Sequence, residues 1–158
     1  MKELSFFQNL IQNHLGCETV LLDHRQLECN PDDLVKIVDF LWKSPETYFD
    51  QLSCLTAIDN GLEKNTFDII YTLYSIPFNE TLHLKVILSR KSNPEIDSLT
   101  AIYKTADWHE REAFDLMGIH FKGHPDLRRI LMPEDWKGHP LRKDYEVQEN
   151  YHGIQVKY

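Results

Sequence analysis

Cysteine is scarce in this chain and scattered along it. The sequence holds three cysteines among 158 residues, Cys17, Cys29 and Cys54, and no two of them form a Cys-x-x-Cys motif. A zinc ribbon, or an iron–sulfur cluster held by one chain, usually needs about four clustered ligands, so neither is expected here. An odd number of isolated cysteines is typical of a reducing compartment, in which the thiols are buried and inert.

Long apolar runs are also missing. No stretch approaches the ~20 apolar residues that a membrane-spanning helix needs. Residues 1–16 lack the long hydrophobic segment and the small-residue cleavage site of a signal peptide, and their spacing predicts a helix instead. We therefore expect a cytosolic protein, or one that docks on a membrane complex through protein contacts.

Familiar catalytic motifs are absent as well. The sequence shows no Gly-rich phosphate loop, no Ser or Cys nucleophile motif and no His-Glu-x-x-His. His120 and His124 are four residues apart, but Gly118, Gly123 and Pro125 disfavour the helix that would align them as metal ligands. Other potential ligands lie near in sequence: His109, Glu110, Glu112, Asp115 and His139. We interpret the acidic ones as charges that hold a helix to the loop after it, so a metal-dependent hydrolase is the weaker alternative.

The net charge of −8 is unevenly distributed along a chain of one-domain length. Residues 1–120 carry 10 Lys and Arg against 19 Asp and Glu, whereas residues 121–145 carry 6 against 4. An acidic body argues against nucleic acid as the main partner. The basic segment indicates a carboxylate-bearing protein surface instead, although charge alone would be explained more simply by a solvated segment.

The first part of the chain shows the periodicities of helices and strands. Helical spacing is found in residues 3–15, 31–43, 96–103 and 108–118, and strand patterns in residues 19–22, 27–29, 51–59, 66–76 and 82–88. Asn30 should cap the second helix, and Asn60-Gly61 should form a turn. The inward side chains of the second helix should be Leu34, Ile37, Val38, Leu41 and Trp42. The order predicts an α+β fold, with a mostly antiparallel sheet of about three to five strands and helices packed on one face.

The stretch from Trp108 to Tyr145 differs from the rest. After its helix, glycine, proline and paired charges are too dense for a regular core element. Its apolar side chains have no period with which to build a core of their own: Leu127, Ile130, Leu131, Trp136, Leu141 and Tyr145. Burying such a side chain against a partner is favourable by roughly 1.5–3 kcal/mol. We therefore predict an α+β body at residues 1–120 and an extended docking tail at residues 121–158.

This stretch also carries a family resemblance. The residues concerned are Glu110-Arg111-Glu112, Asp115 to Ile119, Phe121, Gly123-His124-Pro125, Leu127 to Trp136 and Gly138 to Tyr145. Together they resemble the signature of the C subunit, or thirty-kilodalton subunit, of NADH-quinone oxidoreductase, which is respiratory complex I. The motif is long and specific, whereas the part of the chain before it is less diagnostic.

The resemblance implies a non-catalytic subunit in the peripheral arm of a proton-translocating enzyme complex. Such a complex passes electrons from NADH to quinone through FMN and iron–sulfur clusters in other subunits, and no cofactor is expected in this chain. The resemblance further implies a hetero-oligomer in which this chain docks on the D subunit, with B and I as possible further contacts. Its expected place is the cytoplasmic face of a bacterial inner membrane, as a separate C subunit.

The resemblance also assigns the residues expected to bind a partner. They are Glu110, Arg111, Glu112, Asp115, His124, Arg128, Arg129, Asp135, Trp136, Arg142, Lys143, Asp144 and Tyr145. The signature does not distinguish this interpretation from the equivalent subunit of a membrane-bound hydrogenase or of another complex with a different electron input. A neighbouring reading frame for an NADH-binding flavin subunit would make that distinction.

Overall fold

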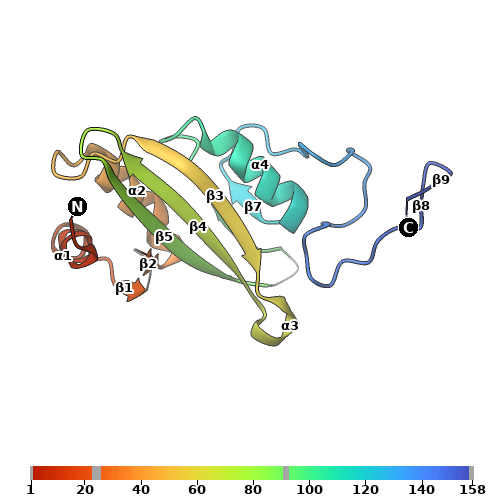
Figure 1. Ribbon diagram of the computed structural model, residues 1–158, viewed down its shortest axis with the longest axis horizontal. Coiled ribbons are helices and arrows are strands. Elements are labelled where there is room, and N and C mark those ends of the chain that lie inside the picture. Colours follow the sequence, from red (N-terminus) through yellow and green to blue (C-terminus); the bar gives the residue numbers. More distant parts are fainter. Residues whose placement is uncertain (1, 23–25, 91–92, 157–158) are drawn as a thin grey trace.

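A five-stranded sheet forms the centre of the computed structural model, which describes residues 2–22, 26–90 and 93–156. The strands lie in the order β1-β2-β5-β4-β3 (Figure 1). Their bounds are Thr19–Leu22 for β1, Gln26–Cys29 for β2, Gln51–Asp59 for β3, Thr66–Ser75 for β4 and Glu80–Ser89 for β5. All neighbours pair antiparallel except β2 and β5, which are parallel. The predicted α+β fold and the meander of three strands are confirmed.

Helices cover one face of this sheet. They are α1 (Leu4–Leu15), the 3-10 turn η1 (Pro31–Asp33) with α2 (Leu34–Lys43), and α4 (Ala106–Met117). The short α3 (Gly61–Lys64) connects β3 to β4 beyond the end of these strands (Figure 1). The alternation along β4 buries Phe67, Ile69, Tyr71 and Leu73, and the paired residues of β5 face the same way. These side chains share one core with residues of α1, α2 and α4. The alternation in the sequence thus specifies which face the helices cover.

Helix boundaries follow the expected signals at two places. The α1 helix ends at Gly16, and the side chain of Asn30 accepts a hydrogen bond from Asp32 N at the start of η1. Four of the five predicted inward residues of the second helix are buried, but Trp42 is 36% exposed, so that part of the prediction is wrong. The turn expected between β1 and β2 falls largely on residues 23–25, which lie outside the described residues.

Two local predictions are wrong, the first for a tertiary reason and the second for a local one. Residues 96–103 do not form a helix, because Glu95–Asp97 is strand β6, which pairs in parallel with β7 (His120–Lys122). Long-range pairing outweighs weak local propensity there. Asn60-Gly61 does not close a tight turn either. Asp59 Oδ1 accepts a hydrogen bond from Gly61 N, and α3 begins at Gly61.

Beyond β7 the chain contains little regular structure. Residues 123–156, which we call the C-terminal segment, hold only the two-residue strands β8 (Asn150–Tyr151) and β9 (Ile154–Gln155) among their described elements. Figure 1 shows this segment running from α4 to the end of the molecule opposite α1. None of the helices in the described ranges combines the length and the apolar character needed to cross a lipid bilayer.

Candidate functional site

The α4 helix carries two fully buried carboxylates, Glu110 and Asp115. They serve different parts of the molecule. Glu110 faces the sheet side and accepts a hydrogen bond from Leu99 N at 2.7 Å. Asp115 faces the C-terminal segment. Because a buried carboxylate is unfavourable without donors, the surroundings of each residue decide what it does.

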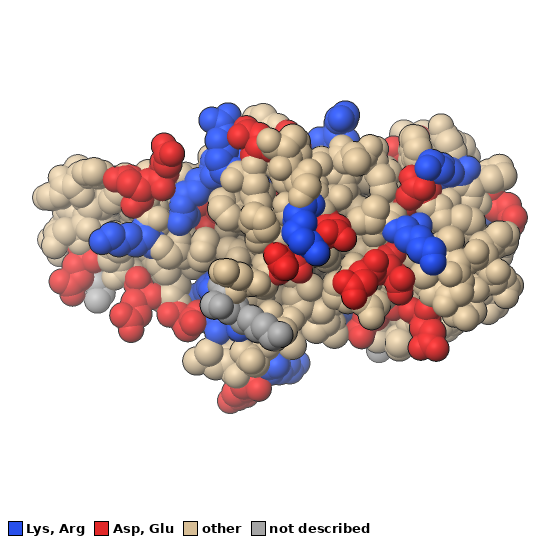
Figure 2. Space-filling view, turned by 180° about the vertical axis from the view of Figure 1, so that it is seen from behind, with Lys and Arg blue, Asp and Glu red and all other residues tan. Residues whose placement is uncertain are grey.

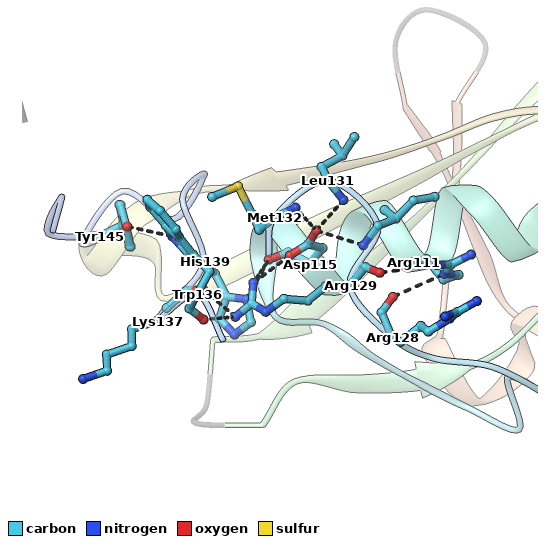
Figure 3. Close-up of polar contacts among 12 residues, drawn as sticks. Arg111, Asp115, Arg128, Arg129, Leu131, Met132, Trp136, Lys137, His139 and Tyr145 are labelled. Atoms are coloured by element: carbon cyan, nitrogen blue, oxygen red, sulfur yellow. Dashed lines mark hydrogen bonds and ion pairs between the residues drawn. The ribbon is translucent and has the colours of Figure 1, made fainter. Parts of the chain in front are cut away.

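The carboxylate of Asp115 accepts hydrogen bonds from several groups of the C-terminal segment (Figure 3). Its Oδ2 accepts hydrogen bonds from three successive N–H groups, Ile130 at 3.1 Å and Leu131 and Met132 at 2.8 Å each. Its Oδ1 accepts one from Arg129 Nη1 at 2.6 Å. Burial by itself would raise the pKa of Asp115, but these N–H groups and the guanidinium outweigh it and lower the pKa below the usual value.

Arginine side chains tie further parts of the segment to this centre. Arg129 Nη2 donates to the carbonyl oxygens of Trp136 and Gly138, both at 2.9 Å. Arg111 on α4 donates to the carbonyl oxygens of Arg128 and Arg129, both at 3.3 Å. The loop from Arg128 to Gly138 is therefore folded onto α4 by contacts within this chain, as Figure 3 shows. Planar guanidinium groups suit this work because they offer several donors in a fixed geometry.

A second cluster lies where α4 ends. Arg142 donates to Met117 O at 2.6 Å and to Gly118 O at 3.3 Å. Its guanidinium lies 5.4 Å from the centre of the Phe67 ring, within the range of a cation–π contact. His139 Nδ1 donates to Asp115 O at 2.9 Å, so His139 and Arg142 both hold this part of the segment against the C-terminal end of α4.

The body contributes a buried ion pair to this second cluster. Arg90 donates twice to Asp59, each time at 2.9 Å, and also to Asp144. Asp59 Oδ2 accepts a further hydrogen bond from Lys143 N at 2.8 Å. Burial opposes ionisation of Asp59, but Arg90 and these N–H groups hold its pKa below the usual value. The end of β3 and the C-terminal segment are joined through this one carboxylate.

The outer part of the segment is held by aromatic and imidazole contacts. Trp136 Nε1 donates to Tyr145 Oη at 3.0 Å, and the rings of Trp136 and Tyr151 lie 5.1 Å apart. Asp135 accepts from Tyr151 Oη at 2.7 Å and is paired with His152. His124, whose side chain is buried, contacts Asp107 O through Nε2 at 3.1 Å.

The structure places the predicted site residues in two groups. Eleven have side chains that bond within this chain: Glu110, Arg111, Asp115, His124, Arg128, Arg129, Asp135, Trp136, Arg142, Asp144 and Tyr145. The other two, Glu112 and Lys143, are exposed. The assignment of all thirteen residues to a partner interface stays a prediction. Asp115 pairs with Arg129 from the segment and not with Arg111, which lies one turn earlier on the same helix.

Sequence reasoning missed three members of the second cluster, Asp59, Arg90 and Phe67. Asp59 was assigned only to the end of a strand, and 84 positions separate it from its partner Lys143. No local pattern could have connected them. His139 was named as a potential metal ligand and as part of the signature, without a contact being assigned to it. Within the three described ranges, no group of three or more His, Cys, Asp and Glu side chains is arranged to hold a metal ion.

Two solved structures share this architecture. A chain of the membrane-bound sulfane sulfur reductase, an archaeal respiratory membrane complex, matches with a TM-score of 0.73 at 19% identity, over 90% of this chain and 84% of that one. The trypsin-resistant fragment (1–134) of Nqo5 matches with a TM-score of 0.62 at 20% identity, over 79% of this chain and 100% of the fragment. At these identities the likeness establishes a common fold.

Sequence relatives define the family. The model of the respiratory-chain NADH dehydrogenase 30 kDa subunit matches residues 27–151. The C subunit of the NADH-quinone oxidoreductase of Chloroherpeton thalassium is 46% identical over 82% of this chain and 53% of its own length. That of Chlorobium phaeobacteroides is 45% identical over 80% of this chain and 76% of its own length. The chain belongs to the family of 30 kDa, or C, subunits of the respiratory-chain NADH dehydrogenase, complex I.

We expect Asp115→Asn to loosen the C-terminal segment. Breaking a buried ion pair costs roughly 3–5 kcal/mol. Thermal unfolding should therefore occur at a lower temperature, and amide hydrogen exchange should become faster in residues 129–139. Since the pKa of Asp115 is lowered, its contribution to stability is present at neutral pH and is lost only as the pH falls below about 4.

The control is Asp126→Asn, whose exposed pair with Arg128 is worth about 0–1 kcal/mol. Equal exchange in Asp115→Asn and the unsubstituted chain would contradict the assigned role.

We expect Gly118→Ala to be much more harmful than Gly123→Ala. Both glycines have positive φ, +70° and +80°, so alanine meets similar backbone strain of about 1–2 kcal/mol at each. A Cβ at position 118 would lie 2.5 Å from the His139 ring and 2.6 Å from Arg142 Nη2, whereas nothing lies within 4 Å at position 123. Urea unfolding of both variants measures the difference. Similar midpoints would show that the close approach of His139 and Arg142 is unimportant.

Proposed function

We propose that this chain is a non-catalytic, structural subunit of a proton-translocating NADH:quinone oxidoreductase, and that it docks its C-terminal segment on the D subunit. Family membership supports this proposal. In such a complex, electrons pass from NADH through FMN and iron–sulfur clusters of other subunits to quinone. The proposed position is peripheral, at the cytoplasmic face of the bacterial inner membrane, with B and I as possible further neighbours.

The observation that carries the proposal is that polar and apolar side chains of the C-terminal segment face in different directions. Its buried polar side chains bind this chain's own α4, and several large apolar side chains are left facing outward. Leu131 is 61% exposed and Leu141 is 55% exposed. Val147 and Ile154 are also exposed. Apolar groups on a segment that is otherwise carefully hydrogen-bonded suit a surface that another protein covers.

Leu141 also borders a hollow between α4 and β3. The hollow has a volume of about 270 Å³, and His109, Glu112 and Leu116 line it together with Leu141. This provides a recess beside the exposed leucine, as expected for a surface that receives side chains from a partner. On the face shown in Figure 2, acidic and basic side chains are interspersed and form no basic patch of the kind that nucleic acid requires.

The signature residues then have an indirect part in docking. Asp115, Arg129 and Arg142 give the segment one shape before the partner arrives. A preformed binding segment loses less conformational entropy on association than a flexible one. The arginines were expected to touch partner carboxylates, and the proposal now gives that direct contact mainly to the exposed apolar residues and to Arg128.

The equivalent subunit of a related membrane-bound respiratory complex is a second candidate. The structural likeness to the sulfane sulfur reductase chain favours it. The much higher sequence identity to the NADH-quinone oxidoreductase C subunits favours the first candidate. Co-purification from membranes, with identification of an NADH-binding flavin subunit among the partners, distinguishes the two.

We expect Leu131→Ala together with Leu141→Ala to reduce the amount of assembled complex without changing the melting temperature of the isolated chain. Each leucine buried at an interface adds up to about 1.5–3 kcal/mol, and each 1.4 kcal/mol changes affinity about tenfold. Ile76→Ala is the matched control, because Ile76 is 60% exposed but lies at the β4–β5 turn. Normal amounts of complex in the leucine variant would refute docking through this surface, and a lower melting temperature would assign the leucines to the fold.

We further propose that this chain binds no flavin or iron–sulfur cluster of its own. Cys17 and Cys29 are buried and Cys54 is part-buried on a separate strand, so the three thiols do not offer a cluster site. The purified chain should therefore show only aromatic absorption. Visible flavin or iron–sulfur bands that return in stoichiometric amounts after refolding and reconstitution would contradict this proposal.

A further inference from the structure

Strand β3 lies at one edge of the five-stranded sheet, where β4 is its one neighbour among the described strands. Figure 1 shows α4 beside this edge. An edge strand presents a row of backbone N–H and C=O groups that the sheet itself does not use, and another strand can pair with them unless they are covered. The extent to which this chain covers the edge of β3 therefore determines whether a further strand can be added.

The first half of the edge is covered by the chain itself. Tyr103 Oη donates a hydrogen bond to Phe49 O at 2.6 Å, just before β3 begins, and Thr105 Oγ1 donates to Leu52 O at 3.1 Å. A register shift between Leu52 and Cys54 then separates this part from the rest of the strand. These contacts occupy carbonyl groups that a further strand would need, so the edge is closed as far as Leu52.

The second half of the edge is open. Asn60 N donates to Thr66 O at 3.1 Å, so the N–H group at position 60 faces the β4 side. Because the backbone direction alternates along an antiparallel strand, the N–H and C=O groups of Leu55 and Ala57 face away from β4. Within residues 2–22, 26–90 and 93–156, no donor or acceptor forms a hydrogen bond with these outward groups. A partner backbone could therefore use them.

The hollow between α4 and β3 runs along this open half. Residues 54–57 line it on the strand side, and Glu112 and Leu116 line it on the helix side. Trp108, which is 67% exposed, lies one turn before Glu112, and Leu141 lies at the other end, where its N–H donates to Leu116 O. A helix rises about 1.5 Å per residue and a strand about 3.3 Å, so α4 from Trp108 to Leu116 matches about four residues of an extended segment.

The charge and polarity of this groove define the kind of segment that fits. Glu112 is exposed, and no Lys or Arg in the described part of the chain forms an ion pair with it. Most other side chains that line the hollow are apolar: Leu55, Ala57, Ala113, Leu116 and Met117. A segment with one apolar side chain for the hollow and one Lys or Arg for Glu112 complements both features, whereas an acidic segment would be repelled.

We propose that an extended segment of a partner subunit adds a strand to β3 at residues 55–57, inserts an apolar side chain beside Leu116 and pairs a Lys or Arg with Glu112. In this mode of recognition, main-chain hydrogen bonds supply affinity, and pockets for alternate side chains supply specificity. The inference rests on the proposed function, because that function supplies the partner subunit. The groove is also continuous with the proposed docking surface, since Leu141 belongs to both.

Hydrogen exchange at single amides, measured on the isolated chain and on the assembled complex, tests the added strand. In the isolated chain, the amides of Leu55 and Ala57 should exchange fast, whereas those of Thr56 and Ile58, which face β4, should be protected. In the complex, the amides of Leu55 and Ala57 should become slower by on the order of 10²-fold. Slow exchange of both amides in the isolated chain would show that α4 or a second copy already covers the edge, and would overturn the proposal. Fast exchange in the complex would overturn it as well.

Two variants test the same groove through assembly. Ala57→Pro removes an N–H that faces away from β4, a position at which an edge strand tolerates proline, so the isolated chain should keep its melting temperature. Affinity for the partner should fall at least two- to tenfold, which is about the value of one hydrogen bond. Glu112→Lys should also lower the amount of complex in membranes, and Glu63→Lys, at an exposed acid on α3, is its matched control. Normal assembly of both groove variants would contradict the proposal.

The outcomes separate this inference from the proposed function. If Ala57→Pro lowers the melting temperature, Glu112→Lys and the exchange of Leu55 decide the matter, because neither depends on a proline in the strand. A complex that needs Leu131 and Leu141 but leaves the amides of Leu55 and Ala57 unprotected would keep the docking proposal and refute the added strand. Partners that include no NADH-binding flavin subunit would refute the proposed function and would leave the exchange result as it stands.

Discussion

The conformation of the last third of this chain depends on the carboxylate of Asp115. Three consecutive N–H groups converge on one of its oxygens, and a guanidinium occupies the other. Such convergence fixes the backbone of a segment that has too few apolar neighbours to fold by burial. Arg129, placed by Asp115, then fixes two carbonyl groups further along. The conformation of residues 129–138 therefore depends on a single buried charge. This is effective because hydrogen bonds to charged groups are stronger than those between neutral groups.

The second cluster also holds the C-terminal segment in place, at the end of β3, but it uses an ion pair that belongs to the body. Asp59 and Arg90 already satisfy each other within the body, and Lys143 N and Asp144 are added to that pair. Phe67 lies under two guanidinium groups, one from the body and one from the C-terminal segment. The two clusters hold the segment through Asp115 and Asp59, carboxylates that are buried in the body. This explains why an irregular segment can be held in place with so little apolar contact.

Much of the fold could be predicted from the sequence, because its central strands alternate clearly. The apolar positions alone indicate the strands that the structure places at residues 66–75 and 80–89, and Gly16 and Gly118 mark helix ends. The β6 strand could not be predicted, because three residues become a strand only by pairing with β7. The site was located by its dense glycine, proline and arginine, but the inward direction of those arginines depends on Asp115 and Asp59. Nothing in the sequence identifies Asp59 as the acceptor of a backbone group 84 positions later.

The long separation between Asp59 and Lys143 has a consequence for how the protein is made. Synthesis proceeds from the N-terminus, so the body, including the Asp59–Arg90 pair, is complete before the residues that bind to it leave the ribosome. Until then Asp59 and Asp115 lack their later donors. A chain that ends early would retain its sheet but would leave both carboxylates without those donors, and its last residues would have no fixed course. Only a chain that extends through residues 123–156 presents the shaped surface that these residues form.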